Sequence, residues 1–285
     1  MLYDTVVGTA RRLVFGLVGL RYSRSSRAKN AAEPPIKLFW WNGEPNFGDR
    51  FMVDLIWRLF GYRSEWVGPE SCDMIGAGSI LDYPVVRLRE KEFRVWGSGF
   101  IKPDSECPRA GVYHLVRGPL TRSRLPLEYK DIPVGDPGLL ANVVYEKARR
   151  SGKIGVVPHY VDKELPIVRA MEEDDRFSVI DVAWSPDVVA RRISECSLVL
   201  SSSLHGLVFA DSYGIPNAHI QLSDRLTGGL YKFTDYYASV GRVYENATIS
   251  KLFDDSYLDS LKKSYVPVRG LFAMQRSLIK SFPYG

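Results

Sequence analysis

The sequence is poor in the residues that build metal centres and disulfide frameworks. Its 285 residues include only three cysteines and four histidines. The cysteines, Cys72, Cys107 and Cys196, are widely spaced and odd in number. This pattern fits neither a zinc site nor a set of disulfides, so we expect inert thiols in a reducing compartment. The histidines also lack a paired spacing such as His-Glu-x-x-His, and no metal site is predicted.

The chain also lacks tandem repeats, low-complexity stretches and a basic stripe interleaved with aromatic residues. The first two absences favour an ordinary globular protein, and 45% hydrophobic residues suffice for a sizeable core. The net charge of +5 is mild and, without such a stripe, predicts no nucleic-acid partner. It does suit acidic ligands or an anionic membrane surface.

Residues 1–35 form a basic arm in which apolar and cationic residues are mixed. Arg11 and Arg12 interrupt its apolar run, which is unlike a signal peptide, and the run is too short and too charged to span a bilayer. Two interpretations of residues 1–30 stay open. They form either an amphipathic helix in the interface of an anionic membrane, or a helix on the protein's own surface followed by a basic linker. The first would hold a cytoplasmic protein at the inner face of the cell membrane.

Short apolar runs alternate with glycine turns and helical patterns along the rest of the chain, and residues 36–41 and 198–200 are typical of buried strands. This alternation predicts an α/β fold with doubly wound parallel sheets. A basic stretch at 147–152 separates two such series. We therefore expect an N-terminal Rossmann-like domain over 36–150 and a C-terminal one, with C-terminal helices, over 151–285. The two would face each other across a central cleft at the carboxyl ends of their strands.

The stretch 198–216 predicts a strand, a tight turn and a helix, with His205 in the first helical turn. Serines precede this helix and Gly214 and Pro216 follow it, which suits the two ends of a helix. The free N–H groups of a helix N-terminus favour an anion. His205 is the only strongly polar side chain in an apolar helix start. It is therefore either a catalytic group or a core histidine bonded to a backbone carbonyl.

Other candidate residues lie where strands end or loops enter helices. Asp49 lies at a helix start and is either a functional carboxylate or a helix cap. Arg117 ends a strand, where its forked guanidinium suits a carboxylate or phosphate, unless it forms a surface salt bridge. His159 follows the first strand of the second half. It is either a functional residue or an exposed loop histidine. Two glycine pairs after strands suit close approach of a phosphate, without completing a nucleotide-binding loop. They are Gly76 with Gly78 and Gly97 with Gly99.

Together these segments resemble the polysaccharide pyruvyl transferase family, in particular the bacterial exopolysaccharide members that make pyruvate ketals. The resemblance runs from about residue 37 to residue 241 and depends on the order and spacing of several short motifs. They are Asn46-Phe47-Gly48-Asp49, Gly76-Ala77-Gly78, Val116-Arg117-Gly118, Val134-Gly135-Asp136-Pro137, Pro158-His159 and Ser203-Leu204-His205-Gly206. The family implies two Rossmann-like halves, similar to the glycosyltransferase B architecture.

The resemblance also implies a reaction. Phosphoenolpyruvate would be the donor co-substrate, with no other cofactor. Two hydroxyls of a terminal sugar, in a polysaccharide or lipid-linked oligosaccharide, would accept pyruvate as a ketal and phosphate would leave.

By the same resemblance, His205 matches a histidine taken to act as acid or base. Arg117 matches an arginine thought to hold the donor's anionic groups, and Asn46 and Asp49 match the first motif. The sequence departs from many members at Ser203, where an arginine is expected. A cation from the following loop would replace that donor contact. The candidates are Lys232, Arg225 and Arg242.

Ketal formation needs a proton delivered to the methylene carbon and another removed from the attacking hydroxyl. Histidine titrates in the useful range. Because a helix N-terminus disfavours imidazolium, we expect His205 to act as the base, or as an acid only when the donor's negative charge lies beside it. His159 or Asp49 would hold the complementary role.

Two alternative functions stay open. A glycosyltransferase that uses a nucleotide sugar has the same architecture and would need an acidic residue for the ribose, such as Asp211 or Asp224. A non-catalytic protein that binds a sugar or an anion is the other alternative, and Ser203 favours it.

Overall fold

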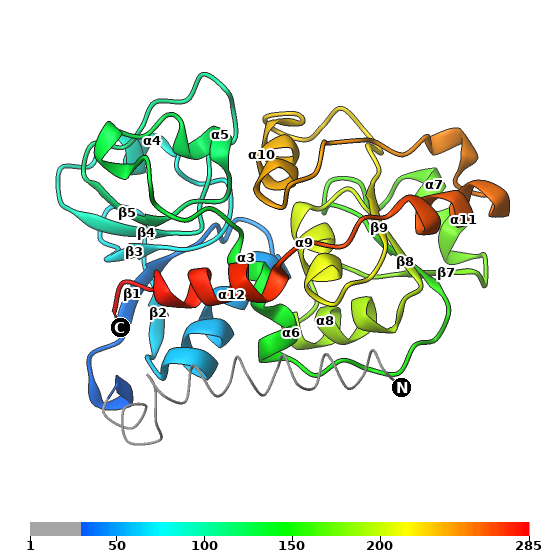
Figure 1. The fold of residues 1–285 in the computed structure, drawn as a ribbon, viewed down its shortest axis with the longest axis horizontal. Coiled ribbons are helices and arrows are strands. Elements are labelled where there is room, and N and C mark those ends of the chain that lie inside the picture. Colours follow the sequence, from blue (N-terminus) through cyan, green and yellow to red (C-terminus); the bar gives the residue numbers. More distant parts are fainter. Residues whose placement is uncertain (1–29, 285) are drawn as a thin grey trace.

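The computed structural model describes residues 30–284. Two parallel β-sheets with helices packed around them make up this part of the chain (Figure 1). The first sheet has the strand order β2-β1-β3-β4-β5 and the second the order β7-β6-β8-β9. This is an α/β fold, and its two parallel sheets are consistent with two Rossmann-like domains. Residues 1–29, to which both interpretations of the basic arm apply, lie outside the described residues.

The first sheet contains the apolar runs that the sequence marks as strands. Its members are β1 (Ile36–Phe39), β2 (Ser64–Trp66), β3 (Met74–Ile75), β4 (Phe93–Trp96) and β5 (Gly111–Leu115). Strand β1 pairs with β2 on one side and β3 on the other. Strand β2 was not expected from the sequence, because an edge strand with mostly exposed residues shows no apolar run.

Helix α3 (Phe47–Leu55) follows β1 and continues as a π-helix over Ile56–Phe60. Gly61 ends it with a φ of 79°, as its position in the sequence predicts. The other helical segments of this half are short. They are α4 (Pro84–Arg87), α5 (Pro119–Arg122), the 3₁₀ turns Leu127–Tyr129 and Pro137–Leu140, and α6 (Ala141–Val144).

The second sheet is built around β8, which is buried along its whole length. Leu200 of β8 pairs with Val156 on one side and Ala218 on the other. The strands are β6 (Ile154–Val157), β7 (Phe177–Val179), β8 (Leu198–Ser201) and β9 (Asn217–His219). The helices are α7 (Pro166–Glu172), α8 (Pro186–Glu195), α9 (Leu204–Ser212) and α10 (Tyr231–Ser239). Among residues 30–284, no helix combines the length and apolar character that crossing a membrane takes.

The last two helices pack on different halves of the protein. Helix α11 (Asp255–Ser264) contacts β9 of the second sheet, whereas α12 (Leu271–Lys280) runs back beneath the first sheet (Figure 1). Trp96 of β4 donates its indole N–H to the Leu278 carbonyl at 3.2 Å, and Phe282 stacks on Phe60 with ring centroids 3.7 Å apart. The C-terminal segment thus packs on the half formed by residues 36–150.

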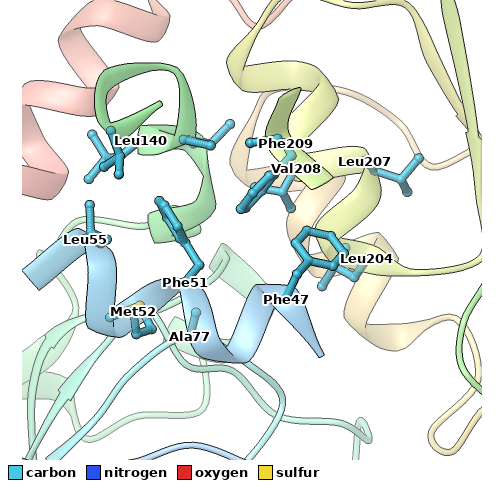
Figure 2. Packing of buried hydrophobic residues seen from close by; sticks show 14 of the residues in the cluster. Phe47, Phe51, Met52, Leu55, Ala77, Leu140, Leu204, Leu207, Val208 and Phe209 are labelled. Carbon is cyan, nitrogen blue, oxygen red and sulfur yellow. The ribbon is translucent and has the colours of Figure 1, made fainter. Parts of the chain in front are cut away.

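The two halves share one hydrophobic core where α3 meets α9. Figure 2 shows the phenyl rings of Phe47 and Phe51 from α3 directed toward Phe209 of α9. Their ring centroids lie 4.9 and 5.0 Å from that of Phe209, with near-perpendicular planes. Such edge-to-face packing fixes α3 against α9, and with them the two loops that enter these helices.

Candidate functional site

A cavity of about 340 Å³ opens where the strand ends of the two halves meet. Its volume lies in the usual range for small-molecule sites, roughly 300–1,000 Å³. Several predicted residues line it together. They are Asn46, Asp49, Gly78, His159, Ser203, His205 and Lys232. They come from both halves, so the structure brings the two sets of strand ends to one site as the doubly wound pattern predicts.

The N-termini of α3 and α9 both lie at this cavity. Asn46, and not Asp49, caps α3, because its side-chain oxygen accepts the Gly48 N–H at 3.0 Å. The cap alternative for Asp49 is therefore wrong, and its carboxyl stays available for another role. The Phe47 and Gly48 N–H groups of α3 already donate to Val182 and Asn46, but the aligned peptide dipoles of the two helix starts still favour a bound anion.

His205, in the first turn of α9, is 7% exposed and lies against Gly48 of α3. A Cβ on Gly48 would fall 1.8 Å from its Nδ1, so only a glycine at that position lets the ring lie there. Its Nε2 faces Asp136 Oδ2 at 4.0 Å. Neither atom has a hydrogen-bond partner among the described residues, so the core histidine bonded to a backbone carbonyl is not observed. Burial lowers the pKa of His205, while Asp136 raises it, so the imidazole is neutral near pH 7.

Asp49 and Lys232 add a carboxyl and an ammonium to the same cavity. Burial raises the pKa of Asp49 to about 7, with Lys232 opposing the rise and Asp136 adding to it. Burial also lowers the pKa of Lys232 to about 8, helped by the Arg117 charge. Near neutral pH the cavity therefore holds a carboxyl that exchanges protons readily and a lysine that is still mostly charged.

His159 lines the cavity beside this group, but its pKa is lowered to about 3, first by burial and then by Lys232 and His205. Its backbone N–H donates to Ser202 at 2.9 Å, and the Ser202 hydroxyl donates to Asp162 at 2.8 Å. His159 is thus a neutral, half-buried side chain on an anchored loop. It is a weak proton donor at neutral pH.

Arg117 does not line the cavity. It is fully buried behind the wall, where its Nε donates to Asp235 Oδ2 at 3.1 Å and its other nitrogens donate to the Ser79 hydroxyl and the Phe100 carbonyl. Asp235 also accepts from the Leu120 N–H, which anchors α10 to α5. The guanidinium therefore joins the two halves and supports the helix that carries Lys232, a contact between distant residues that no local pattern reveals.

Three of the four predicted glycines also face protein and not the cavity. A Cβ on Gly76 would meet Met52, one on Gly97 would meet Pro137, and one on Gly99 would meet Arg117, all within 3 Å. Gly78 is the exception. It lines the cavity with a φ of 111°, and Asp49 Oδ1 lies 3.0 Å from where its Cβ would be. Glycine is required there because other residues rarely adopt this conformation.

The three cations that could replace the arginine expected at Ser203 do not all lie at the cavity. Lys232 and Arg225 line the cavity with Ser203, whereas Arg242 is bonded to the buried Asp211 elsewhere. Asp211 also accepts hydrogen bonds from Asn217, Tyr236 and Tyr265. This leaves it unsuited to a ribose.

Sequence reasoning missed the aromatic residues of the cavity, Trp41, Tyr83 and Tyr160. Two of them could have been found from the sequence, because Trp41 ends the apolar run that contains β1 and Tyr160 directly follows His159. Tyr83 could not, since it reaches the cavity from the loop before α4. Within residues 30–284 no three His, Cys, Asp or Glu side chains are grouped as metal ligands would be.

Comparison with known proteins places the chain in a family. The family model described as polysaccharide pyruvyl transferase matches residues 41–224. This interval includes the cavity residues of both halves up to His205. The chain belongs to the polysaccharide pyruvyl transferase family.

Two relatives and one solved structure are similar to it. An uncharacterized protein of Acanthamoeba polyphaga mimivirus is 37% identical over 223 residues, covering 72% of this chain and 75% of that protein. The succinoglycan biosynthesis protein ExoV of Rhizobium meliloti is 25% identical over 217 residues, covering 73% of this chain and 66% of ExoV. The crystal structure of an uncharacterized protein from Klebsiella pneumoniae aligns with a TM-score of 0.41 and 11% identity, over 81% of this chain and 99% of that one.

Proposed function

We propose that this protein transfers the pyruvyl group of phosphoenolpyruvate to two hydroxyls of a saccharide, forming a pyruvate ketal and releasing phosphate. The observation that carries the proposal is the meeting of His205, Asp49 and Lys232 in one cavity shared by both halves. Membership of the polysaccharide pyruvyl transferase family and the similarity to a succinoglycan biosynthesis protein support it. The two-sheet arrangement also suits the proposed likeness to the glycosyltransferase B architecture.

The donor carries a carboxylate and a phosphate on a small carbon frame, so it needs cations and N–H groups close together. Lys232 and Arg225 provide the cations, and the starts of α3 and α9 provide favourable dipoles. Arg117 acts in this proposal through the position of α10, not through contact with the donor.

The pKa values assign the proton transfers. Asp49, with a pKa of about 7, is partly protonated at neutral pH and delivers its proton to the methylene carbon. His205, with a lowered pKa, takes the proton of the first sugar hydroxyl as its oxygen bonds to the neighbouring carbon. His205 is preferred as base and Asp49 as acid, because His159 is neutral at this pH and a neutral imidazole is a weak proton donor.

The second half of the reaction returns both groups to their first state. The protonated His205 gives its proton to the phosphate oxygen as the carbon–oxygen bond breaks. The second sugar hydroxyl then bonds to the same carbon and gives its proton to the Asp49 carboxylate. The sum is one ketal and one phosphate from one donor and one diol, and it needs no oxidant or reductant.

The experiment is incubation of the full chain with phosphoenolpyruvate and candidate lipid-linked oligosaccharides. Phosphate is measured in solution and the saccharide by mass spectrometry. We expect phosphate release together with the mass gain of one pyruvate less one water. His205→Ala should stay folded by circular dichroism and lose both signals. A wild-type protein that is stabilised by nucleotide sugars and not by phosphoenolpyruvate would instead favour the glycosyltransferase alternative, and ligand binding without turnover would favour the non-catalytic one.

A further inference from the structure

Aromatic side chains from both halves form one wall of the cavity. Trp41 follows β1 in the first half and Tyr160 follows β6 in the second. Their rings stack with centroids 5.5 Å apart and an interplanar angle of 18°. Tyr83, next to α4, lines the same cavity, and all three side chains are only partly buried. We call Trp41, Tyr83 and Tyr160 the aromatic wall.

The aromatic wall is held in place by its neighbours. A Cβ on Gly43 would lie 2.6 Å from the indole of Trp41, so the loop backbone packs directly against that ring. Phe39 meets Tyr83 edge to face with centroids 5.8 Å apart, and His159 packs on Tyr160 at 4.3 Å. Rings that are already positioned lose little conformational freedom when a ligand binds, which favours affinity.

The chemistry of the aromatic wall differs from that of the rest of the cavity. Lys232, Arg225 and the two helix starts suit an anion, whereas the wall offers uncharged aromatic surface that the stack of Trp41 on Tyr160 leaves facing the cavity in part. Aromatic ring faces carry partial negative charge and attract C–H groups. A pyranose presents C–H bonds on its flat faces and hydroxyls around its edge, so it can stack on a ring while its hydroxyls remain free to react.

We propose that the aromatic wall is the binding site of the acceptor saccharide, which stacks on it and turns two hydroxyls toward His205 and Asp49. This inference rests on the proposed function and assigns the saccharide, the second substrate of that reaction, to the aromatic wall. The donor would lie at the helix starts with Lys232, and the sugar between the donor and the mouth of the cavity. Because Trp41 and Tyr160 belong to different halves, the sugar contacts both.

The test measures saccharide and donor binding separately on the full chain. Methyl β-D-glucopyranoside, methyl β-D-galactopyranoside and uridine are the probes in saturation-transfer NMR, and phosphoenolpyruvate is followed by thermal shift. The variants are Trp41→Ala and Tyr160→Ala, with Trp41→Phe as a conservative replacement. Trp184→Ala is the matched control, because Trp184 is an exposed tryptophan that does not line the cavity.

We expect glycoside affinity to fall about 2- to 12-fold in Trp41→Ala and Tyr160→Ala, taking the energy of one aromatic–aromatic contact as the measure of the lost ring. Trp41→Phe should recover most of it, and Trp184→Ala should leave it unchanged. The stabilisation by phosphoenolpyruvate should persist in every variant. The saturation pattern should be strongest at the protons of one sugar face.

The outcomes separate the aromatic wall from the proposed function. If glycoside binding is unchanged in both alanine variants, the aromatic wall is not the saccharide site, even when the donor still binds. A wild-type protein that binds neither glycoside, or that binds uridine in preference, overturns this assignment as well. A wild-type protein that binds the glycosides through the wall, yet gains no stability from phosphoenolpyruvate, contradicts the proposed function alone.

Discussion

Replacement of Asp49 by asparagine should stabilise the protein and abolish its turnover. The carboxyl is 6% exposed, and its burial raises its pKa from 3.8 to about 7. Asparagine has nearly the shape of the protonated acid, so it keeps the packing against Gly78, but it has no acidic proton to deliver. A catalytic acid whose pKa is raised by burial should lower the stability of the protein and yet be needed for the reaction.

The magnitude follows from the two pKa values. The unfolded chain loses this proton near pH 3.8, whereas the folded protein keeps it up to about pH 7. Between these values the folded state binds more protons, so the stability of the wild type falls as the pH rises. At about 1.4 kcal/mol per pKa unit, the cost reaches about 4 kcal/mol. It is absent below pH 3.8 and fully developed above pH 7.

The assay is urea denaturation of both proteins at several pH values between about 5 and 8. The difference in free energy of unfolding isolates Asp49, because every other group titrates in both proteins. We expect the advantage of Asp49→Asn to grow with pH and phosphate release to be lost throughout. Asp224→Asn is the control, since Asp224 is an exposed carboxyl outside the cavity. An advantage that does not change with pH, or a variant that is less stable at pH 8, would refute the reasoning.

Two further predictions concern the cationic residues. Because the pKa of Lys232 is about 8, affinity for phosphoenolpyruvate should fall as the pH rises through that value, and Lys232→Met should bind weakly without this dependence. Isothermal titration calorimetry at several pH values measures both, and an affinity of the wild type that stays constant would contradict the donor role. Arg117→Met should lower the free energy of unfolding by about 3–5 kcal/mol, because Asp235 is left buried without its partner. Urea denaturation checks this, and a loss below about 1 kcal/mol would show that the ion pair contributes little.

Local patterns were enough to predict the elements that position the site. The buried β8, the turn after it and the start of α9 could be recognised because apolar runs, small hydroxyl residues and a terminal glycine act within a few residues of one another. They place His205 at a strand end in any parallel sheet. The same patterns could not decide which nearby side chain caps α3, since Asn46 and Asp49 both suit a helix start and only the backbone geometry selects Asn46.

The sequence by itself determined the buried apolar strands, the order of glycine turns and glycines that end helices such as Gly61, because these depend on neighbours along the chain, whereas the exposed edge strand β2 escaped it. Only the tertiary structure decided that Arg117 turns inward to Asp235, 118 positions away, and that α12 returns to the first sheet. It also decided that Trp41 stacks on Tyr160 from the other half at one wall of the cavity. Burial depends on what packs against a side chain from distant segments, and burial is what sets the pKa values of Asp49, His205 and Lys232.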